Sequence, residues 1–266
     1  MSAPSLNRIG ALVLRHWYLL RSSWPRLLDM VYWPTVQMLT WGFITVSLAP
    51  PAGAAGQGLG VLLGAALLWD VLLRAQLGTS MSFLEEMYSR NLGHLMASPL
   101  RPIEFLAALA TVGMLRTLVG MVPTSLLAIW FFGFSIYDMG LSLAAFFALL
   151  VFMGWAIGLF IAGLVMRVGM GAEALAWGFV FAIAPLSAVF YPLAVLPEWL
   201  QPVSLALPST HVFEGMRALL RDGVVRGDHL AAAFALDLLY LGLGIAAFLA
   251  FHESARDRGR LLQMGE

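Results

Sequence analysis

Hydrophobic residues form long, almost uncharged runs along the chain, and short polar intervals separate these runs. A helix that crosses a bilayer needs about 20 predominantly apolar residues, because lipid offers the backbone no hydrogen-bond partners. Six runs meet this length: 27–48, 59–81, 103–132, 141–166, 172–195 and 230–251. The pattern therefore predicts an all-α, polytopic membrane protein with a transmembrane domain over 27–251.

The segment before the first run, 1–26, alternates apolar and polar positions at helical spacing. Its apolar residues recur every three to four positions: Leu6, Ile9, Val13, Trp17 and Leu20. This spacing predicts an amphipathic helix that lies on the membrane surface. A cleavable signal peptide is disfavoured, because Arg15, His16 and Arg21 interrupt the apolar core that such a peptide needs.

Arginine placement predicts the orientation, since short arginine-rich loops stay in the cytoplasm. Arginine occurs in the first segment, in the second-to-third and fourth-to-fifth connections, and in the tail 252–266. The first-to-second and third-to-fourth connections have none, so both termini are predicted to be cytoplasmic. The interval before the last run breaks this pattern with Arg217, Arg221 and Arg226, for which Glu214, Asp222 and Asp228 are the expected partners.

The interval after the second run predicts a short amphipathic helix over 83–98. Apolar residues fall at helical spacing, while Glu86, Arg90 and His94 recur every four residues on another side. Glu86 and Arg90 have the favourable order of an i,i+4 pair. Two roles remain open for this helix: a passive element at the headgroups, or a docking helix for a cytoplasmic partner.

A second unusual interval, 184–223, combines apolar character with frequent proline. Its prolines are Pro185, Pro192, Pro197, Pro202 and Pro208. Proline at this frequency excludes one straight helix, so we expect short helical pieces over 186–207 that dip back into the outer leaflet. An ordinary external loop anchored by Trp199 is the alternative.

Four charged residues lie inside predicted spans: Asp70, Arg74, Arg116 and Asp237. Such residues are functional candidates by default, because a charge in lipid is costly. Asp70 and Arg74 are four residues apart and are expected to pair structurally. Arg116, expected near mid-bilayer, and Asp237 have two open roles, an interhelical lock or a lining of the substrate path.

Composition narrows the function further. Hydrophobic residues make up 61% of the 266 residues and charged residues 11%, and the net charge of zero gives no indication of nucleic-acid binding. The chain has no cysteine, and all 15 basic residues are arginine, so a phosphate-binding loop lysine is absent. If ATP is used, another chain must hydrolyse it. No metal-ligand spacing or catalytic arrangement is present, and Gly242 and Gly244 favour close helix packing.

Two segments resemble the membrane subunits of type-2 ATP-binding-cassette (ABC-2) exporters, which include permeases for drugs, nodulation factors, polysaccharides and glycolipids. They are "NLGHLMASPLRPIEFL", 91–106, and "FYPLAVLPEWLQPVSLALPSTHVFEGMRALL", 190–220. The order of elements along nearly the whole chain is similar to that family. One departure is Leu207 before Pro208, where many relatives have Asn-Pro.

The resemblance implies specific roles for both intervals. The helix 83–98 would be a coupling helix seated in a groove of a separate nucleotide-binding subunit, with contacts from Glu85, Glu86, Met87, Arg90, Asn91, His94 and Leu95. The segment 186–207 would close the outer end of the pathway, with Phe190, Tyr191, Pro192, Pro197, Trp199 and Pro208 at this gate. The family also implies two permease copies with two ATPase chains, ATP and magnesium on the partner, no cofactor here, and a bacterial inner-membrane location.

Two other classes of protein compete with an exporter subunit that moves an amphiphile. An ion-coupled secondary transporter or channel would use the four intramembrane charges, but it predicts an internal inverted repeat with broken helices in both halves, whereas proline breaks occur in one half. A membrane-embedded enzyme would need a polar catalytic cluster that the sequence does not show.

Overall fold

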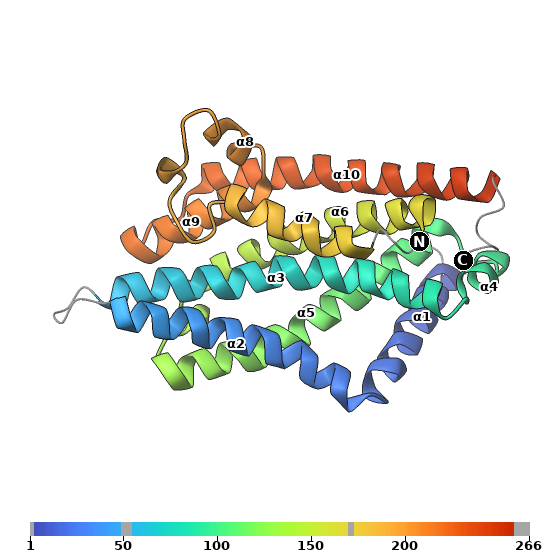
Figure 1. Ribbon diagram of the computed structural model, residues 1–266, viewed down its shortest axis with the longest axis horizontal. Helices are drawn as coiled ribbons and strands as arrows, with labels where there is room; N and C mark the ends of the chain where they lie inside the picture. Colours follow the sequence, from blue (N-terminus) through green and yellow to red (C-terminus); the bar gives the residue numbers. More distant parts are fainter. Residues whose placement is uncertain (1–2, 49–54, 170–172, 258–266) are drawn as a thin grey trace.

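A computed structural model describes residues 3–48, 55–169 and 173–257, and within these ranges the chain is helical with no strand. The expected all-α class is thus what these residues adopt. Figure 1 shows an elongated bundle in which one long helix, α3, runs along the middle. The helices are α1 (Ala3–Arg21), α2 (Trp24–Leu48), α3 (Ala55–Tyr88), α4 (Leu92–Ala97), α5 (Pro102–Phe132), η1 (Ile136–Met139), α6 (Leu141–Val168), α7 (Glu173–Leu186), η3 (Leu193–Val195), α8 (Gln201–Leu205), α9 (Pro208–Asp222) and α10 (Gly227–Asp257).

Within the described residues, four helices are long and apolar enough to cross a membrane: Gly60–Tyr88, Pro102–Phe132, Leu141–Val168 and Gly227–Asp257. The 25 residues of α2 include Arg26, Asp29 and Gln37, which lower its hydropathy, and α7 has only 14 residues. Both helices nevertheless lie alongside the long helices in Figure 1. A polytopic membrane protein therefore agrees with the structure, while six spans stay an expectation.

The two ends of the bundle differ in character. Helices α1 and α4 lie at one end together with the last turns of α10, whereas α8 and α9 lie toward the other (Figure 1). The start of α1 and the end of α10 are therefore on the same side of the bundle, as the arginine pattern predicts. Which membrane side each end faces stays a prediction.

The amphipathic start of the chain is shorter than expected. α1 ends at Arg21, and the break at Ser22 and Ser23 lets α2 begin at Trp24, so the last residues of 1–26 belong to the next helix. Pro25 fits there, because proline is tolerated in the first turn of a helix. At the other terminus α10 continues to Asp257, and the rest of the predicted tail 252–266 lies outside the described residues.

The helix predicted over 83–98 is wrong as a single element. α3 continues through Glu85, Glu86 and Met87 to Tyr88, and only Leu92–Ala97 forms the separate helix α4. Arg90 adopts a left-handed conformation, φ 52°, which turns the chain between the two helices. Apolar spacing continues from one helix into the next, and for this reason the sequence pattern reads as one helix.

The predicted break in the fifth run is confirmed. α7 ends at Leu186, one residue after Pro185, and short helical pieces η3 and α8 follow, as expected from the prolines. The predicted start of this run, residue 172, lies outside the described residues. Leu207 is the N-cap residue of α9, and its apolar side chain makes no capping hydrogen bond. Pro208 follows at the first helical position, where proline is favoured.

Small residues let α3 approach its neighbours closely. A Cβ built on Gly78 would lie 2.8 Å from Gly113 Cα of α5, and one on Gly154 of α6 would lie 2.6 Å from Ala75 Cβ. In lipid, the hydrophobic effect does not drive helices together, so close van der Waals packing of this kind stabilises their association. Gly244 of α10 packs against Ala156 of α6 in the same way, as predicted, whereas a Cβ built on Gly242 would meet no other described atom within 4 Å, so the predicted packing at Gly242 does not occur within the described part of this chain.

We predict opposite effects for two glycine-to-alanine changes in these helices. Gly78→Ala forces α3 and α5 apart and should lower stability by about 1–3 kcal/mol, whereas Gly242→Ala meets no atom and should be neutral or raise it by up to about 1 kcal/mol. Thermal melting of the purified protein in one detergent measures both. Equal melting temperatures for the two variants would contradict the close crossing of α3 and α5.

Candidate functional site

The turn between α3 and α5 carries most of the residues expected to contact a partner, and it separates them into a buried and an exposed set. Glu86, Met87 and Leu92 are buried, while Arg90, His94 and Ser98 are exposed. Leu92 and Met87 belong to a core cluster that Leu95 joins from its partly buried position. Glu85, Asn91 and Leu95 are intermediate. α4 thus rests its apolar side on the bundle and presents a polar side outward.

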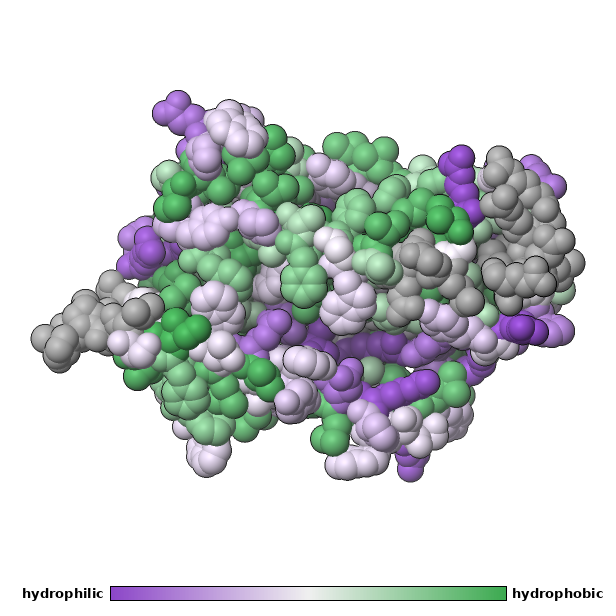
Figure 2. Space-filling model, in the orientation of Figure 1, coloured by the Kyte–Doolittle hydropathy of each residue, from purple (hydrophilic) through white to green (hydrophobic). Residues whose placement is uncertain are grey.

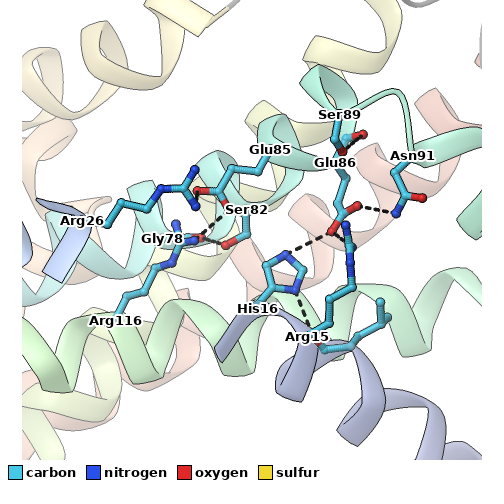
Figure 3. A network of polar contacts seen from close by, with 11 residues as sticks. Arg15, His16, Arg26, Gly78, Ser82, Glu85, Glu86, Ser89, Asn91 and Arg116 are labelled. Atoms are coloured by element: carbon cyan, nitrogen blue, oxygen red, sulfur yellow. Dashed lines mark hydrogen bonds and ion pairs between the residues drawn. The ribbon is translucent and has the colours of Figure 1, made fainter. Parts of the chain in front are cut away.

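Glu86 is a carboxylate with 1% exposure, and side chains from another helix converge on it (Figure 3). Arg15 of α1 donates to Glu86 Oε1, and His16 Nε2 lies 3.3 Å from the same oxygen. Asn91, just before α4, donates to Oε2 at 2.8 Å. A buried charge is tolerated when it is paired and hydrogen-bonded. Glu86 therefore ties α1 to the end of α3 and the start of α4.

A second carboxylate fastens the beginning of α1. Arg8 donates to the Pro99 carbonyl at 2.7 Å, and its other terminal nitrogen lies 3.1 Å from Glu104 Oε1. Glu104 also accepts hydrogen bonds from Ser5 Oγ at 2.5 Å and from the Arg101 backbone at 3.0 Å. The latter bond caps the first turn of α5. The connection from α4 to α5 is thereby held by α1 as well.

The predicted pair of Glu86 with Arg90 is wrong. Glu86 points into the bundle toward α1, whereas Arg90 is exposed beyond the end of α3. The i,i+4 rule applies only within one continuous helix, and the helix ends between these two residues. The charged face that the sequence predicted is therefore divided between an internal network and an external surface.

Glu85 is shared by arginines of two other helices, as Figure 3 shows. Arg116 Nη2 of α5 donates to Glu85 Oε2 at 2.9 Å, and Arg26 Nη1 of α2 lies 3.8 Å from Oε1. Side chains on a helix lean toward its N-terminus, so Arg116 of α5 and Glu85 of the antiparallel α3 lean toward each other. The guanidinium of Arg116 thus reaches toward the C-terminal end of α3 from a position near the Gly78–Gly113 contact, and its depth in the membrane stays a prediction.

Asp70 and Arg74 form the predicted pair, with Arg74 Nε 2.6 Å from Asp70 Oδ2. Arg74 lies against Gly120 of α5, since a Cβ on Gly120 would be 2.8 Å from Arg74 Nε, and the Met30 carbonyl of α2 approaches the same glycine at the same distance. Glycine at this position makes room for the guanidinium between helices. The pair therefore lies where α2, α3 and α5 meet, which supports a structural role.

Asp237 contrasts with the other intramembrane charges. It has 0% exposure in α10, and within the described ranges neither carboxylate oxygen has a hydrogen-bond partner. An interhelical lock with an arginine, one of its two expected roles, does not occur among those residues. A buried group without compensation in a span marks a functional candidate.

Arg217 is one of the three arginines that break the orientation pattern, and its contacts give it a structural role. It is 4% exposed and donates to the carbonyls of Ala188 at 2.6 Å and Val189 at 3.1 Å, where α7 has ended. Glu214 pairs with Arg217 at 2.9 Å and accepts from the Leu193 backbone at 2.7 Å. Burial lowers the pKa of Arg217 below its ordinary value, and the Glu214 carboxylate opposes that shift. Arg217 is thus a structural residue, and Arg226 pairs with Asp228 as expected.

The residues expected at the outer gate lie between the end of α7 and the first residue of α9. Phe190 stacks on Trp41 of α2 with ring centroids 4.1 Å apart, and the Tyr191 hydroxyl donates to the Pro185 carbonyl. Pro192 precedes η3, and the Pro197 carbonyl accepts from Leu200 at 2.8 Å. Trp199 is exposed, whereas Pro208 is buried. The segment is held by α9 on one side and touches α2 through Phe190.

Two further features bear on ligands. An apolar groove of about 530 Å³ lies between α6, α7 and α10, and its only side-chain hydroxyl, from Tyr240, donates to the Ala206 carbonyl at 3.1 Å. Among the residues with described positions, no group of three His, Cys, Asp or Glu could hold a metal ion.

The order of these elements matches a known family. A family model described as "ABC-2 type transporter" matches residues 8–220, from α1 to the last turns of α9. The chain belongs to the ABC-2 type transporter family. The match includes α4 and the proline-rich segment, the two intervals on which the resemblance rests. A comparison with curated proteins found no match.

Membership identifies a membrane permease component of the ABC transporter class, and ABC-2 permeases work with a nucleotide-binding ATPase subunit. In this ABC-2 permease the residues that tie α1 to the α4 turn were missed from the sequence. Arg8, Arg15 and His16 fall on the polar side of an amphipathic pattern, which is typical of solvent or headgroup contact. The available signal was the presence of two acids, Glu86 and Glu104, at the borders of this turn, together with the arginines of the first segment.

We predict that replacing each of the two buried aspartates by asparagine has a different effect on stability. Asp237→Asn keeps a polar side chain of the same size and excludes an unpaired buried charge, so it should leave stability unchanged or raise it by up to about 1 kcal/mol, while Asp70→Asn strands Arg74 and should destabilise the permease by about 3 kcal/mol. Melting temperatures in the same detergent measure both changes. Destabilisation by Asp237→Asn would show that its carboxylate has a stabilising partner.

Proposed function

We propose that this chain is the membrane-spanning subunit of an ATP-driven exporter that moves an amphiphilic substrate out of the cytoplasm. A separate nucleotide-binding subunit hydrolyses ATP with its own magnesium, and this chain makes or breaks no chemical bond. Two copies of the permease work with two ATPase subunits in a bacterial inner membrane, with both termini in the cytoplasm. Family membership and the geometry of the α4 turn support the proposal.

The observation that carries the proposal is the two-sided placement of α4. Its buried side is continuous with the core of the bundle through Leu92, while Arg90 and His94 project from the end of the molecule. A bare connection between two long helices needs only a few residues and no such division. A polar surface on a short rigid element suits docking to a soluble subunit, so Arg90, Asn91 and His94 are the proposed contacts.

The internal carboxylates supply a route for movement from this surface into the bundle. A push on α4 acts on Asn91 and Pro99, which are bonded to Glu86 and Arg8. Glu86 binds α1, and Glu85 binds α2 and α5 through Arg26 and Arg116. Glu86 is almost fully buried, so breaking its pair with Arg15 is costly, and displacement of the whole unit is favoured over local distortion.

At the opposite end, the segment 186–207 is proposed to close the pathway outside. Arg217 and Glu214 hold its backbone to α9, while Phe190 rests on Trp41 of α2. Because α2 also carries Arg26, which contacts Glu85, one helix touches both the coupling end and the gate. Rigid movement of α2 would then alter the aromatic contact at the gate.

An ion-coupled secondary transporter or channel is the alternative, and Asp237 is the observation that favours it. Ion coupling needs charges that are available to a cation, but Asp70 pairs with Arg74 and Glu85 with Arg116. Asp237 alone gives no chain of sites along a pathway. Transport by the purified permease without any ATPase would favour this alternative.

We predict that reversing the charge of the exposed α4 surface removes the ATPase subunit. The tagged permease is purified in mild detergent from cells that express it natively, and bound ATPase is measured by mass spectrometry and by vanadate-sensitive ATP hydrolysis. The double variant Arg90→Glu/His94→Glu should retain about tenfold less ATPase, because it reverses charge at the docking surface.

The matched control is Arg226→Glu, which reverses an exposed arginine beside α10 at the other end of the bundle. It should retain as much ATPase as the unchanged protein. Full retention by the double variant, or no ATPase with the unchanged protein in several detergents, would refute the proposed role of α4.

A further inference from the structure

We propose that Arg26 and Arg116, on either side of Glu85, bind the anionic head of the transported amphiphile at the α1–α4 end of the bundle. The inference rests on the proposed export function and names the class of its substrate: a molecule with an apolar tail and a phosphate-bearing head. The phosphate class is favoured because guanidinium groups match the geometry of phosphate oxygens.

Charge around Glu85 is unequal. Two guanidiniums face one carboxylate, which leaves one positive charge uncompensated within this cluster. The nearest further acid on α2, Asp29, is exposed and accepts from Trp33 Nε1 at 2.9 Å on its own helix. An anion entering the cluster would balance it, whereas a cation would meet two like charges.

Hydrogen-bond donors are also left over. Arg116 is 8% exposed, and its Nε is buried with no acceptor in the described part of the chain. Such a donor is costly to leave unsatisfied. Arg26 makes only a 3.8 Å contact with Glu85, and its side chain is 47% exposed, so its guanidinium can turn to a ligand without breaking a short bond.

The cluster continues along α3 as a polar strip. Arg74 lies eleven residues before Glu85, about three turns and about 16 Å along the same face of the helix. Figure 2 shows a hydrophilic strip that follows the boundary between α3 and the arm formed by α1 and α2. A head released from Arg26 and Arg116 would next meet Arg74, whose Asp70 partner makes that position neutral overall.

An amphiphile fits this position better than a free ion. α2 exposes Trp33 seven residues after Arg26, about two turns along the same face of that helix. This side chain offers apolar contact for a tail while the head is held by arginine. A tail in the bilayer with its head at the cytoplasmic end is also the orientation of a lipid in the inner leaflet.

The test measures binding of two amphiphiles with the same tails to the full chain in nanodiscs of neutral lipid. Dioctanoyl phosphatidic acid carries a phosphate, and dioctanoyl glycerol does not. Native mass spectrometry or tryptophan quenching should show about tenfold tighter binding of the phosphate-bearing molecule. Equal binding of the two would overturn the proposal, and displacement by inorganic phosphate at the same concentrations would overturn its amphiphile part.

Two variants should change phosphatidic acid binding in opposite directions, and a third serves as the control. Arg26→Gln should weaken phosphatidic acid binding about fivefold, while Glu85→Gln should strengthen it severalfold by releasing both arginines. Arg226→Gln, an exposed arginine at the other end, should leave binding unchanged. Arg26→Gln tests the proposal even if Arg116→Gln fails to fold, because Arg26 has no short contact in the described structure.

Unchanged affinity in both Arg26→Gln and Glu85→Gln would refute the site. No ATPase takes part in this assay, so its outcome is separate from that of the co-purification experiment. If the unchanged permease retains no ATPase while its preference for the phosphate-bearing amphiphile is intact, the export function is refuted and a lipid-phosphate site remains.

Discussion

The cost of burying a carboxylate is the constraint on which the α1–α4 end of this permease depends. Glu86 is almost without solvent contact at the point where α3 ends, so it must be paired with donors from elsewhere in the chain. Arg15 and His16 of α1 and Asn91 before α4 are the groups beside it. An amphipathic helix that lipid alone would hold loosely is therefore fixed to the turn that faces the proposed ATPase.

Close helix packing extends this fixed unit into the bundle. Gly78 and Gly113 bring α3 against α5, and Ala75 meets Gly154 of α6, so a displaced α3 carries its neighbours with it. The Arg116–Glu85 pair joins α3 to α5 on the α1–α4 side of that crossing. Packed cores do not deform continuously, and movement of rigid elements is the expected response to a push at one end.

Much of the architecture follows from local sequence patterns, in which residues close together in the chain determine the outcome. Long apolar runs predict helices, prolines predict the break after Leu186, and the spacing of Asp70 and Arg74 predicts their pair. The pairs that cross between helices could not be predicted, since Glu86 with Arg15 and Arg217 with the Ala188 carbonyl depend on how distant segments meet. The predicted Glu86–Arg90 pair does not form because α3 ends between the two residues. A spacing of four residues does not reveal where a helix ends.

The central claim is that Glu86 makes α1 and α4 one unit. The chain has no cysteine, so Tyr18→Cys on α1 and Ala97→Cys on α4, both at exposed positions outside the proposed contacts, can carry spin labels. Double electron–electron resonance on the complex with its ATPase should give a narrow distance within one permease copy that stays unchanged on ATP binding, and Glu86→Gln should broaden it. An α1-to-α4 distance that changes with ATP, or that Glu86→Gln leaves narrow, would contradict the claim.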